Sequence, residues 1–482
     1  MTLVPAHDSD SRDTMPLPAG RGTLSPSGAG MTVKSGTRKE AEKMPRSRPW
    51  IVALSALALL LSLAAGPLLG DARAQDQVEL RVWDQFTVPT ESDNADAIYA
   101  AFMEQNPNVT ITRESFSTDQ IRDVVNTAIS SGTGPDLIFY DAGPGYAGVL
   151  ADANLLLPLD DYAAQYGWDE RVAAPALEAT TLRGTLYGMP LQTDLIGMYY
   201  NQTLLDQEGM TVPETIDELV TFCGEATEKG YIPIAFADNE GWQAFHQFSM
   251  TANQMVGPEG IRALLNNEGS WDTPEIVTAI EAFFVTLRDA GCFPEDSVAI
   301  PYEDGNSLFY NGEALLHTTG SWLIAEIAEN MPDTEVGFVP FPEIEGGQGR
   351  VWISGVGSAW YISSTTQNPD VAAAFIDYLF SQEALEKWIG VSRYFVPVEA
   401  DLSNVDINPL SGLVIETLQT AGDEGVQFGY NVDVLAPPEF NDMMLNGFQA
   451  MLVGDKTAEQ QAADLEAAWN EGMPESEATP TS

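Results

Sequence analysis

The sequence has 482 residues, of which 44% are hydrophobic, and this is enough for large cores in two or three domains. Its 71 Asp and Glu greatly outnumber its 21 Lys and Arg, which gives a net charge of −50. Such a negative field argues against nucleic acid, anionic membrane surfaces and polyanionic ligands as partners.

The first segments are expected to lie outside the folded part. Residues 1–45 are rich in Pro, Gly, Ser and Thr and predict a disordered extension. Residues 46–74 have the layout of a secretory signal peptide, with Arg46 and Arg48 ahead of an apolar run over 51–69. We therefore expect an exported protein, located in the periplasm or on the outer face of the cytoplasmic membrane.

A small-residue cleavage site at 72–74 would start the mature protein near Gln75. No cysteine stands directly after the apolar run, so a lipid attachment site is not expected. Retention of the run as an anchor stays open. The translation start also stays open between Met1, Met31 and Met44.

The two cysteines, Cys223 and Cys292, both follow this leader. An even pair in an exported protein suggests a disulfide. Neither His246 nor His317 stands at a zinc-ligand spacing from them, so no metal site is expected.

The next segments alternate between strand and helix patterns. Strands are predicted over 78–84, 109–113 and 137–140, and a helix over 96–105. A capping box at 117–120 predicts the start of another helix. This alternation indicates a parallel sheet with helices on its faces, and hence an α/β fold.

A longer segment, residues 184–205, predicts a turn and then a strand that ends near Asn201. The polar run Gln192-Thr193-Asp194 interrupts this otherwise apolar strand. Polar groups within a buried strand are costly unless they are hydrogen-bonded or face a cleft. The segment alone leaves open an ordinary buried strand with one satisfied Asp.

This segment and several others resemble extracellular solute-binding proteins of the carbohydrate type, which are the maltose-binding-protein-like capture subunits of ABC importers. In that family a Gly-x-x-Tyr-Gly-x-Pro segment runs into a hinge strand that ends in Tyr-Tyr-Asn. Further motifs in the family's order are Phe102-x-x-x-Asn106-Pro107, Ser131-Gly132-x-Gly134-Pro135-Asp136, Leu157-Pro158-Leu159-Asp160, Asn311-Gly312-Glu313-Ala314, Gly320-Ser321-Trp322, Gly355-x-Gly357-Ser358 and Phe395-x-Pro397-Val398.

The resemblance implies a two-lobed, type II-like periplasmic-binding-protein fold. Each lobe is then a sheet flanked by helices, and the ligand cleft lies at the hinge. The implied assignment is 75–191 and 334–381 to the first lobe and 192–333 and 382–473 to the second. Residues 474–482 are expected to be a disordered tail.

A sugar site needs aromatic side chains against the C–H faces of the ring and polar groups around its hydroxyls. In maltose-type relatives an acid at the Asp194 position and an aromatic at the Trp322 position contact sugar. Any single Trp is also a candidate for core packing. The complete set of predicted ligand-binding residues is Trp83, Gln85, Tyr140, Asp141, Asp194, Trp242, Trp322, Trp352, Gly355, Arg393 and Tyr394.

The chain departs from the maltose pattern in two places. It has Gln85-Phe86 where that pattern has an Asp-Lys pair, and it lacks the Asp-Arg pair after Tyr140. Maltodextrin is therefore not predicted as the ligand.

A glycine-rich motif, Gly143-Pro-Gly145-Tyr-Ala-Gly148, matches a dinucleotide fingerprint. It follows a third strand rather than the first, and Pro144 removes a backbone donor, so we reject a nicotinamide or flavin site and expect no cofactor. The resemblance places this loop at the cleft edge, where Tyr146 could face the ligand.

We expect a monomeric protein that captures a mono- or oligosaccharide and delivers it to ABC permease subunits, without catalysis. A non-sugar ligand, such as a polyamine, a peptide or a phosphorylated alcohol, is the main alternative. A secreted carbohydrate-active enzyme is a further alternative, because counting carboxylates does not exclude a glycosidase pair; chance pairs are expected in so acidic a chain, which argues against it.

Overall fold

The computed structural model describes residues 77–420 and 427–473. The expected extension (1–45), signal peptide (46–74) and tail (474–482) lie outside these residues. Within the described ranges, no helix combines the length and apolar character needed to cross a bilayer.

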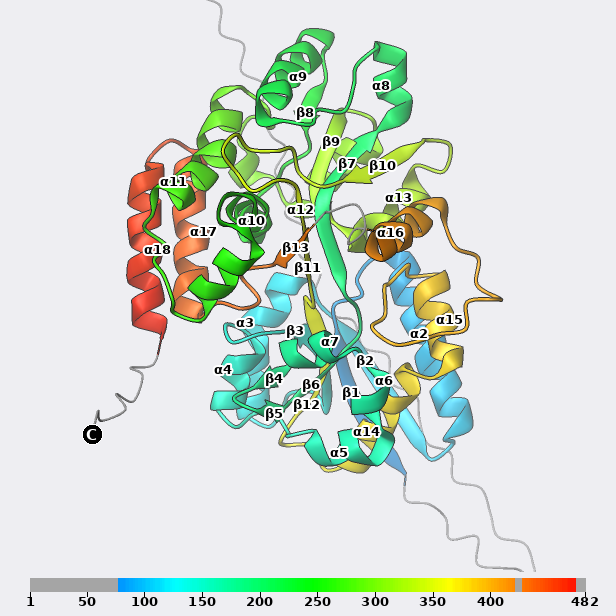
Figure 1. The fold of residues 1–482 in the computed structure, drawn as a ribbon. Helices are drawn as coiled ribbons and strands as arrows, with labels where there is room; N and C mark the ends of the chain where they lie inside the picture. Colours follow the sequence, from blue (N-terminus) through cyan, green and yellow to red (C-terminus); the bar gives the residue numbers. More distant parts are fainter. Residues whose placement is uncertain (1–76, 421–426, 474–482) are drawn as a thin grey trace, which may run out of the picture. The chain divides into compact units, whose positions relative to one another are not determined.

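The first lobe is built on a five-stranded sheet in the order β2-β1-β3-β12-β6 (Figure 1). As expected, β1 runs parallel to both β2 and β3, whereas β12 runs antiparallel to its neighbours β3 and β6. In β1, Leu80 and Val82 are fully buried, which agrees with the predicted alternation. The strands are β1 (Val78–Asp84), β2 (Val109–Ser115), β3 (Leu137–Asp141), β6 (Gly188–Pro190) and β12 (Ser358–Ile362).

Helices cover both faces of this sheet. Helix α2 (Pro89–Gln105) begins seven residues before the predicted start. Pro89 stands in its first turn, where proline is favoured, and Val88 before it provides no side-chain cap. The predicted capping box of α3 is present between Ser117 and Gln120. The other elements of this lobe are α3 (Thr118–Ser130), α4 (Ala147–Asp152), α5 (Asp160–Tyr166), α6 (Trp168–Arg171), α7 (Ala174–Ala179), α14 (Pro369–Leu379), α15 (Gln382–Gly390) and the pair β4 (Thr181–Leu182) and β5 (Thr185–Leu186).

The second lobe contains a six-stranded sheet with β7 at its centre. Strand β7 pairs with β9 along one edge, and β10 and β11 share its other edge. All of these pairings are antiparallel. At the two ends of the sheet, β8 pairs in parallel with β9, and β13 pairs in parallel with β11. The strands are β7 (Asp194–Asn201), β8 (Ile232–Ile234), β9 (Ala314–Gly320), β10 (Val336–Val339), β11 (Val351–Gly355) and β13 (Gln427–Tyr430).

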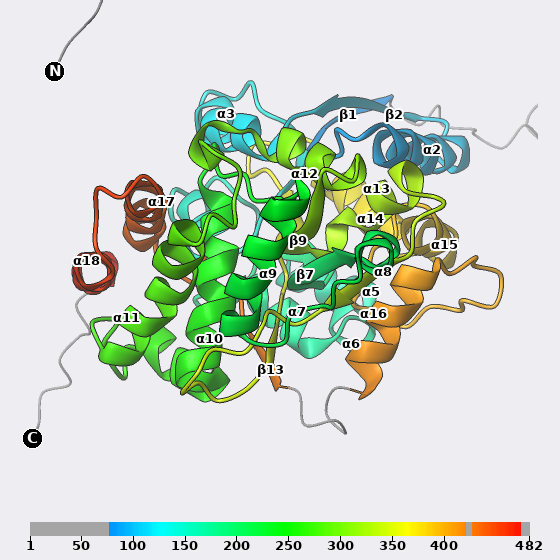
Figure 2. The ribbon, with the colours of Figure 1, turned by 90° about the horizontal axis from the view of Figure 1, so that it is seen from above.

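A large helical layer accompanies this second sheet (Figure 2). Helices α17 and α18 pack against each other, and both join α10 and α11 in one apolar core. The helices are α8 (Gln202–Glu208), α9 (Ile216–Lys229), α10 (Trp242–Leu265), α11 (Pro274–Glu281), α12 (Tyr302–Tyr310), α13 (Ile324–Asn330), α16 (Pro409–Thr420), α17 (Pro438–Leu452) and α18 (Ala458–Gly472).

The two cysteines form a disulfide within the second lobe. Cys223 on α9 bonds to Cys292, 69 positions further along the chain, and both side chains are fully buried. Closing a loop of this length stabilises the fold by roughly 4 kcal/mol in the chain-entropy model.

The structure corrects two of the lobe boundaries. Residues 334–355 were expected in the first lobe, but β10 and β11 pair with β7 and so belong to the second. Residues from 382 were expected in the second lobe, yet α15 packs on α2, and Trp388 and Tyr394 lie in the first core. The chain therefore crosses between the sheets at 191–193, again at 356–357, and a third time after Val398, which still bridges to the first lobe.

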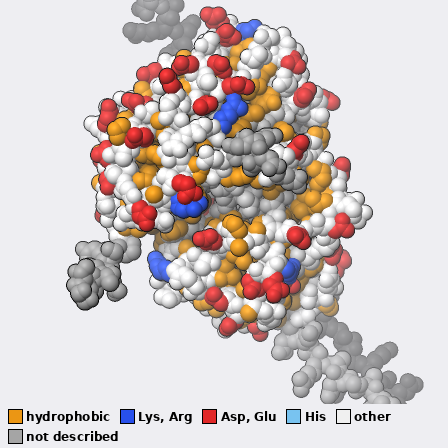
Figure 3. Space-filling view, in the orientation of Figure 1, with side chains coloured by type: hydrophobic (Ala, Val, Ile, Leu, Met, Phe, Trp, Pro, Cys, Tyr) orange, Lys and Arg blue, Asp and Glu red, His pale blue; other side chains and the backbone are white. Residues whose placement is uncertain are grey.

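The surface carries the charge excess of the sequence. On the face drawn in Figure 3, Asp and Glu side chains are spread widely and Lys and Arg are few. This pattern is typical of a solvated acidic surface that favours solubility.

Candidate functional site

A cavity lies where the two sheets meet, and the strand ends explain its position. Strands β1 and β3 end at this edge of the first sheet, so Gln85 and Asp141 line the cavity. In the second sheet β9 and β11 end here, whereas the antiparallel β7 begins here with Asp194. Ligands in open α/β sheets bind outside the carboxyl ends of strands, which is the geometry found at this edge.

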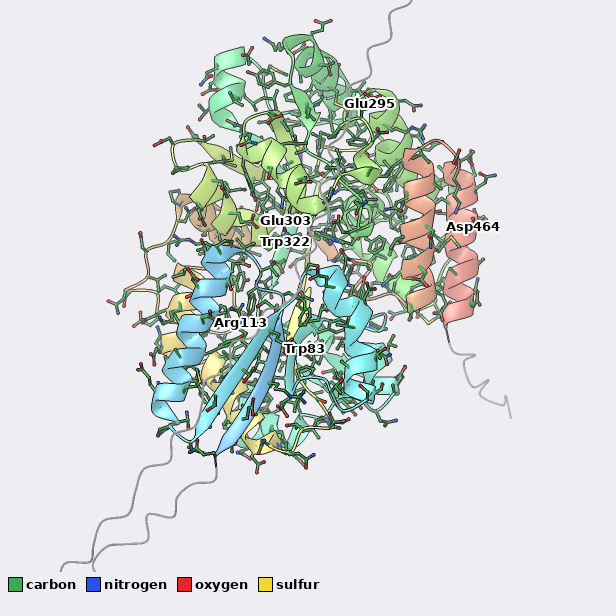
Figure 4. The ribbon with its side chains drawn as sticks, turned by 180° about the vertical axis from the view of Figure 1, so that it is seen from behind. Trp83, Arg113, Glu295, Glu303, Trp322 and Asp464 are labelled. Carbon is green, nitrogen blue, oxygen red and sulfur yellow. A yellow bond between two sulfur atoms is a disulfide. The ribbon has the colours of Figure 1, made fainter. Side chains whose placement is uncertain are left out.

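The end of β1 is held by a buried ion pair. Asp84 is fully buried and accepts a hydrogen bond at 2.6 Å from Arg113 of β2. Arg113 is labelled in Figure 4. Asp84 also accepts from the Tyr99 hydroxyl at 3.0 Å and from the Ser115 hydroxyl at 2.7 Å. These bonds satisfy the carboxylate completely, so its role is to fix the position of the next residue, Gln85, at the cavity wall.

Asp194 is the buried acceptor at the hinge. One of its carboxyl oxygens accepts from the Ser321 hydroxyl and the other from the Gln192 amide, both at 3.0 Å. Burial raises the Asp194 pKa to about 7, while these two hydrogen bonds act in the opposite direction. The side-chain oxygen of Gln192 has no partner among the described residues, so it remains free to accept a bond from a ligand.

Four rings gather on the second-lobe wall. The Trp242 and Tyr302 ring centroids are 4.6 Å apart, and those of His246 and Trp322 are 5.3 Å apart. The Trp322 indole donates to the Tyr302 hydroxyl at 2.9 Å, which fixes the orientation of both rings. Burial lowers the His246 pKa to about 3, so this imidazole is neutral.

Carboxyl groups from three helices also line the cavity. Burial is the main reason why the Glu91 pKa is raised to about 8; a hydrogen bond from Tyr394 lowers it, and the nearby Glu326, Glu303 and Asp194 add smaller upward contributions. Burial and then Glu303 raise the Glu326 pKa to about 7. The Tyr310 hydroxyl donates to Glu326 at 3.1 Å. In Figure 4, Glu303 lies beside Trp322.

The cavity lining also contains one basic side chain. Arg122 of α3 donates to Asp141 at 2.8 Å and stacks over the Tyr146 ring at 4.5 Å. Asp433 of the second lobe also lies close to Arg122. Burial raises the Asp433 pKa to about 7, and Arg122 opposes this effect. One carboxyl oxygen of Asp433 has no partner among the described residues.

Seven of the predicted ligand-binding residues line the cavity: Gln85, Asp141, Asp194, Trp242, Trp322, Gly355 and Tyr394. Their contact with a ligand stays a prediction. Tyr146, which the resemblance placed at the cleft edge, lines it too.

Four predicted residues lie outside the cavity lining. Trp83 packs on Phe116 at 4.8 Å, and Tyr140 joins it in the same core. Trp352 packs on Phe338 at 4.9 Å in the second lobe. Arg393 turns away and donates to the Asp406 carbonyl at 2.8 Å. The three aromatic residues are therefore core residues.

Sequence reasoning missed several cavity residues, namely Glu91, Arg122, His246, Tyr302, Glu303, Glu326, Asn431 and Asp433. Glu91 and Glu303 lie in the first turns of α2 and α12, each directly after a proline-containing start. The proline could have predicted where each helix begins. No local pattern indicates that the side chains of the first turn line a cavity.

One family of sequences matches this chain. The family described as bacterial extracellular solute-binding protein matches residues 89–386. The multiple sugar-binding protein of Streptococcus mutans is 26% identical over 334 residues, covering 65% of this chain and 74% of the relative. The maltotriose-binding protein of Pyrococcus abyssi is 24% identical over 318 residues, covering 66% of each chain. An ABC transporter extracellular-binding protein of Pyrococcus horikoshii is 23% identical, covering 61% of this chain and 70% of the relative.

Solved structures share the fold. A chitin oligosaccharide binding protein superposes with a TM-score of 0.74 and 21% identity, covering 82% of this chain and 99% of that chain. A solute-binding protein in complex with raffinose gives a TM-score of 0.64 and 21% identity over 82% and 99%. These similarities confirm the expected two-lobed α/β fold.

We expect the ligand-free protein to become more stable as the pH falls from about 8 towards 5. The folded-state pKa values of Glu91 and Asp194, about 8 and about 7, lie above the value of about 4 in an unfolded chain. The folded state therefore binds more protons in this interval, and the resulting stability is lost as the pH rises through the folded-state pKa values.

Melting temperatures between pH 5 and pH 8 measure this dependence. Glu91→Gln should flatten it, whereas the exposed Glu295→Gln should not. A melting temperature that increases with pH would contradict the expectation.

Proposed function

The chain belongs to the bacterial extracellular solute-binding proteins, and we propose that it captures a sugar in the cavity between its two lobes. The ligand is a mono- or oligosaccharide, which the protein delivers to the permease subunits of an ABC importer. The protein acts outside the cytoplasm as a monomer and releases its ligand unchanged.

The observation that carries this proposal is the composition of the cavity wall. Aromatic faces at Trp242, Trp322 and Tyr394 match the apolar C–H faces of a sugar ring. Buried polar atoms without partners among the described residues, on Gln192 and Asp433, suit the hydroxyl groups around its rim. The sugar-binding names of the relatives support the same class of ligand.

Contacts between the lobes support closure around the ligand. At Gly143 of the first lobe, an added Cβ would lie 1.7 Å from the Val434 carbonyl oxygen of the second. At Gly145 it would lie 2.7 Å from the Asn441 amide nitrogen. The glycines of this motif thus allow the backbones of the two lobes to approach closely. This role explains the glycine-rich pattern without a dinucleotide site. Closure removes water and strengthens the hydrogen bonds to the ligand.

Thermal unfolding of the full chain with a panel of mono- and oligosaccharides tests the function. A sugar that binds only the folded state increases the free energy of unfolding, by about 2.7 kcal/mol at a hundredfold excess over its Kd. The melting temperature increases accordingly. A shift with at least one sugar is expected. Shifts with spermidine or glycerol phosphate alone would overturn the sugar assignment.

Asp194→Ala should weaken sugar binding by roughly ten- to a hundredfold, because it removes a buried acceptor and leaves the Ser321 and Gln192 donors unpaired. Isothermal titration calorimetry measures this change. The exposed Asp169→Ala is the matched control and should bind normally. Unchanged affinity in Asp194→Ala would remove this residue from the site.

Gly143→Ala should weaken sugar binding by about tenfold or more, because the new methyl group forces the loop away from Val434 and hinders closure. Gly184→Ala is the control: it has a similar positive φ of +80°, and an added Cβ meets no atom within 4 Å. Equal affinity in the two variants would show that the close approach does not matter for binding. Circular dichroism of the ligand-free variants checks that both fold.

A further inference from the structure

The charges that line the cavity are strongly unbalanced. Six carboxylates face it, and Arg122 is the only Lys or Arg among the described residues of the lining. Arg122 is already bound by Asp141 at 2.8 Å and lies near Asp433. The other lining carboxyl groups, on Glu91, Asp194, Glu303 and Glu326, have no basic partner within the described lining, and burial raises the pKa of each.

Three of these carboxylates converge on one region. Glu91 comes from α2 of the first lobe, while Glu303 and Glu326 come from α12 and α13 of the second. The Thr90 hydroxyl of α2 bonds to Glu329 of α13, so the first turn of α2, which carries Glu91, lies beside the helix that carries Glu326. Repulsion from Glu303 and Glu326 accordingly raises the Glu91 pKa, and repulsion from Glu303 raises the Glu326 pKa. Repulsion of this kind is relieved when a positive group lies between the carboxylates.

Aromatic rings stand at the same place. Glu303 directly follows Tyr302, whose hydroxyl accepts from the Trp322 indole at 2.9 Å. The Trp242 ring lies 4.6 Å from Tyr302 and 6.4 Å from Trp322. An ammonium group is attracted to the faces of Trp and Tyr rings, and most strongly where water is excluded.

Two buried groups of the cavity lining point independently to a bound ligand. Gln192 and His246 are 9% and 7% exposed and line the cavity, and each has a polar atom without a partner among the described residues: the Gln192 side-chain oxygen and His246 Nδ1. The first is an acceptor, and a neutral imidazole offers one acceptor nitrogen. Unpaired buried groups of this kind are costly unless a ligand completes them.

A metal ion does not fit the same side chains. Among the described residues, no three His, Cys, Asp or Glu side chains are close enough together to hold one. An ammonium group does not need direct contact with all three carboxyl groups, because its N–H donors can bond to one or two of them while its charge is attracted to the others across the cavity.

We propose that the captured sugar carries a free amine, whose ammonium group lies between Glu91, Glu303 and Glu326 and against the ring of Trp322. This inference rests on the proposed sugar-binding function and narrows it to amino sugars. The unpartnered oxygens of Gln192 and Asp433 are then available to the neutral hydroxyls.

Matched sugars test the amine directly. Isothermal titration calorimetry of the full chain compares glucosamine, galactosamine and chitosan oligosaccharides with their N-acetylated and neutral counterparts. At least one amine-bearing sugar should bind about tenfold more tightly than its counterparts. If no amine-bearing sugar binds more tightly, the inference is overturned. Binding of the neutral sugars would then leave the proposed function standing, whereas binding of spermidine without any sugar would overturn both.

Variants locate the amine. Glu303→Gln and Glu326→Gln keep the size of each side chain and should each reduce the preference for the amine severalfold, with little change for the neutral counterpart. Glu295→Gln is the control, because Glu295 is exposed and lies away from Trp322 in Figure 4. A preference for the amine that survives in both cavity variants would overturn the assignment of these carboxylates.

Discussion

The pairing of strand β7 is the constraint on which the second lobe and the cavity both depend. Its two edges are covered by β9 on one side and by β10 and β11 on the other. At Gly197 an added Cβ would lie 2.6 Å from both the Trp352 ring and the Val339 carbonyl oxygen. A strand this tightly packed has one register, because a slip by one residue would turn every side chain to the opposite face. That register places Asp194 at the cavity and turns Trp352 into the core.

Around this fixed strand the protein keeps an unusual excess of buried acidity. Burying a carboxylate without a positive partner disfavours its charged form, and the raised pKa values of Glu91, Asp194 and Asp433 express that cost. A cavity filled with apolar side chains would be more stable but would recognise nothing polar. A ligand that pairs with these buried carboxyl groups would recover the free energy that their burial costs the folded protein. Perturbed groups of this kind are common at functional sites.

The sequence predicted those features that depend on local patterns. The alternation in β1, the capping box of α3 and the end of the hinge strand at Asn201 are all local, and the structure contains them. Which face of a strand meets the cavity is not local. The resemblance therefore placed Trp83 and Tyr140 at the cleft, although both pack inside a core. Glu91, Glu303 and Glu326 come from three helices far apart in the chain, so only the tertiary structure brings them together.

The repeated crossing of the chain between the sheets has a consequence for the order of folding. The first sheet needs β12 (Ser358–Ile362) to join β3 to β6, and the second needs β11 (Val351–Gly355) beside β7. Neither lobe can be completed by the first 350 residues of a growing chain, whose early strands keep unpaired edges until then. Such pairings between distant segments make folding slow, because the long loops must close before the contacts form. Most of the chain is synthesised before either lobe can become stable, and this leaves a long interval in which the polypeptide is still extended and open to chaperones.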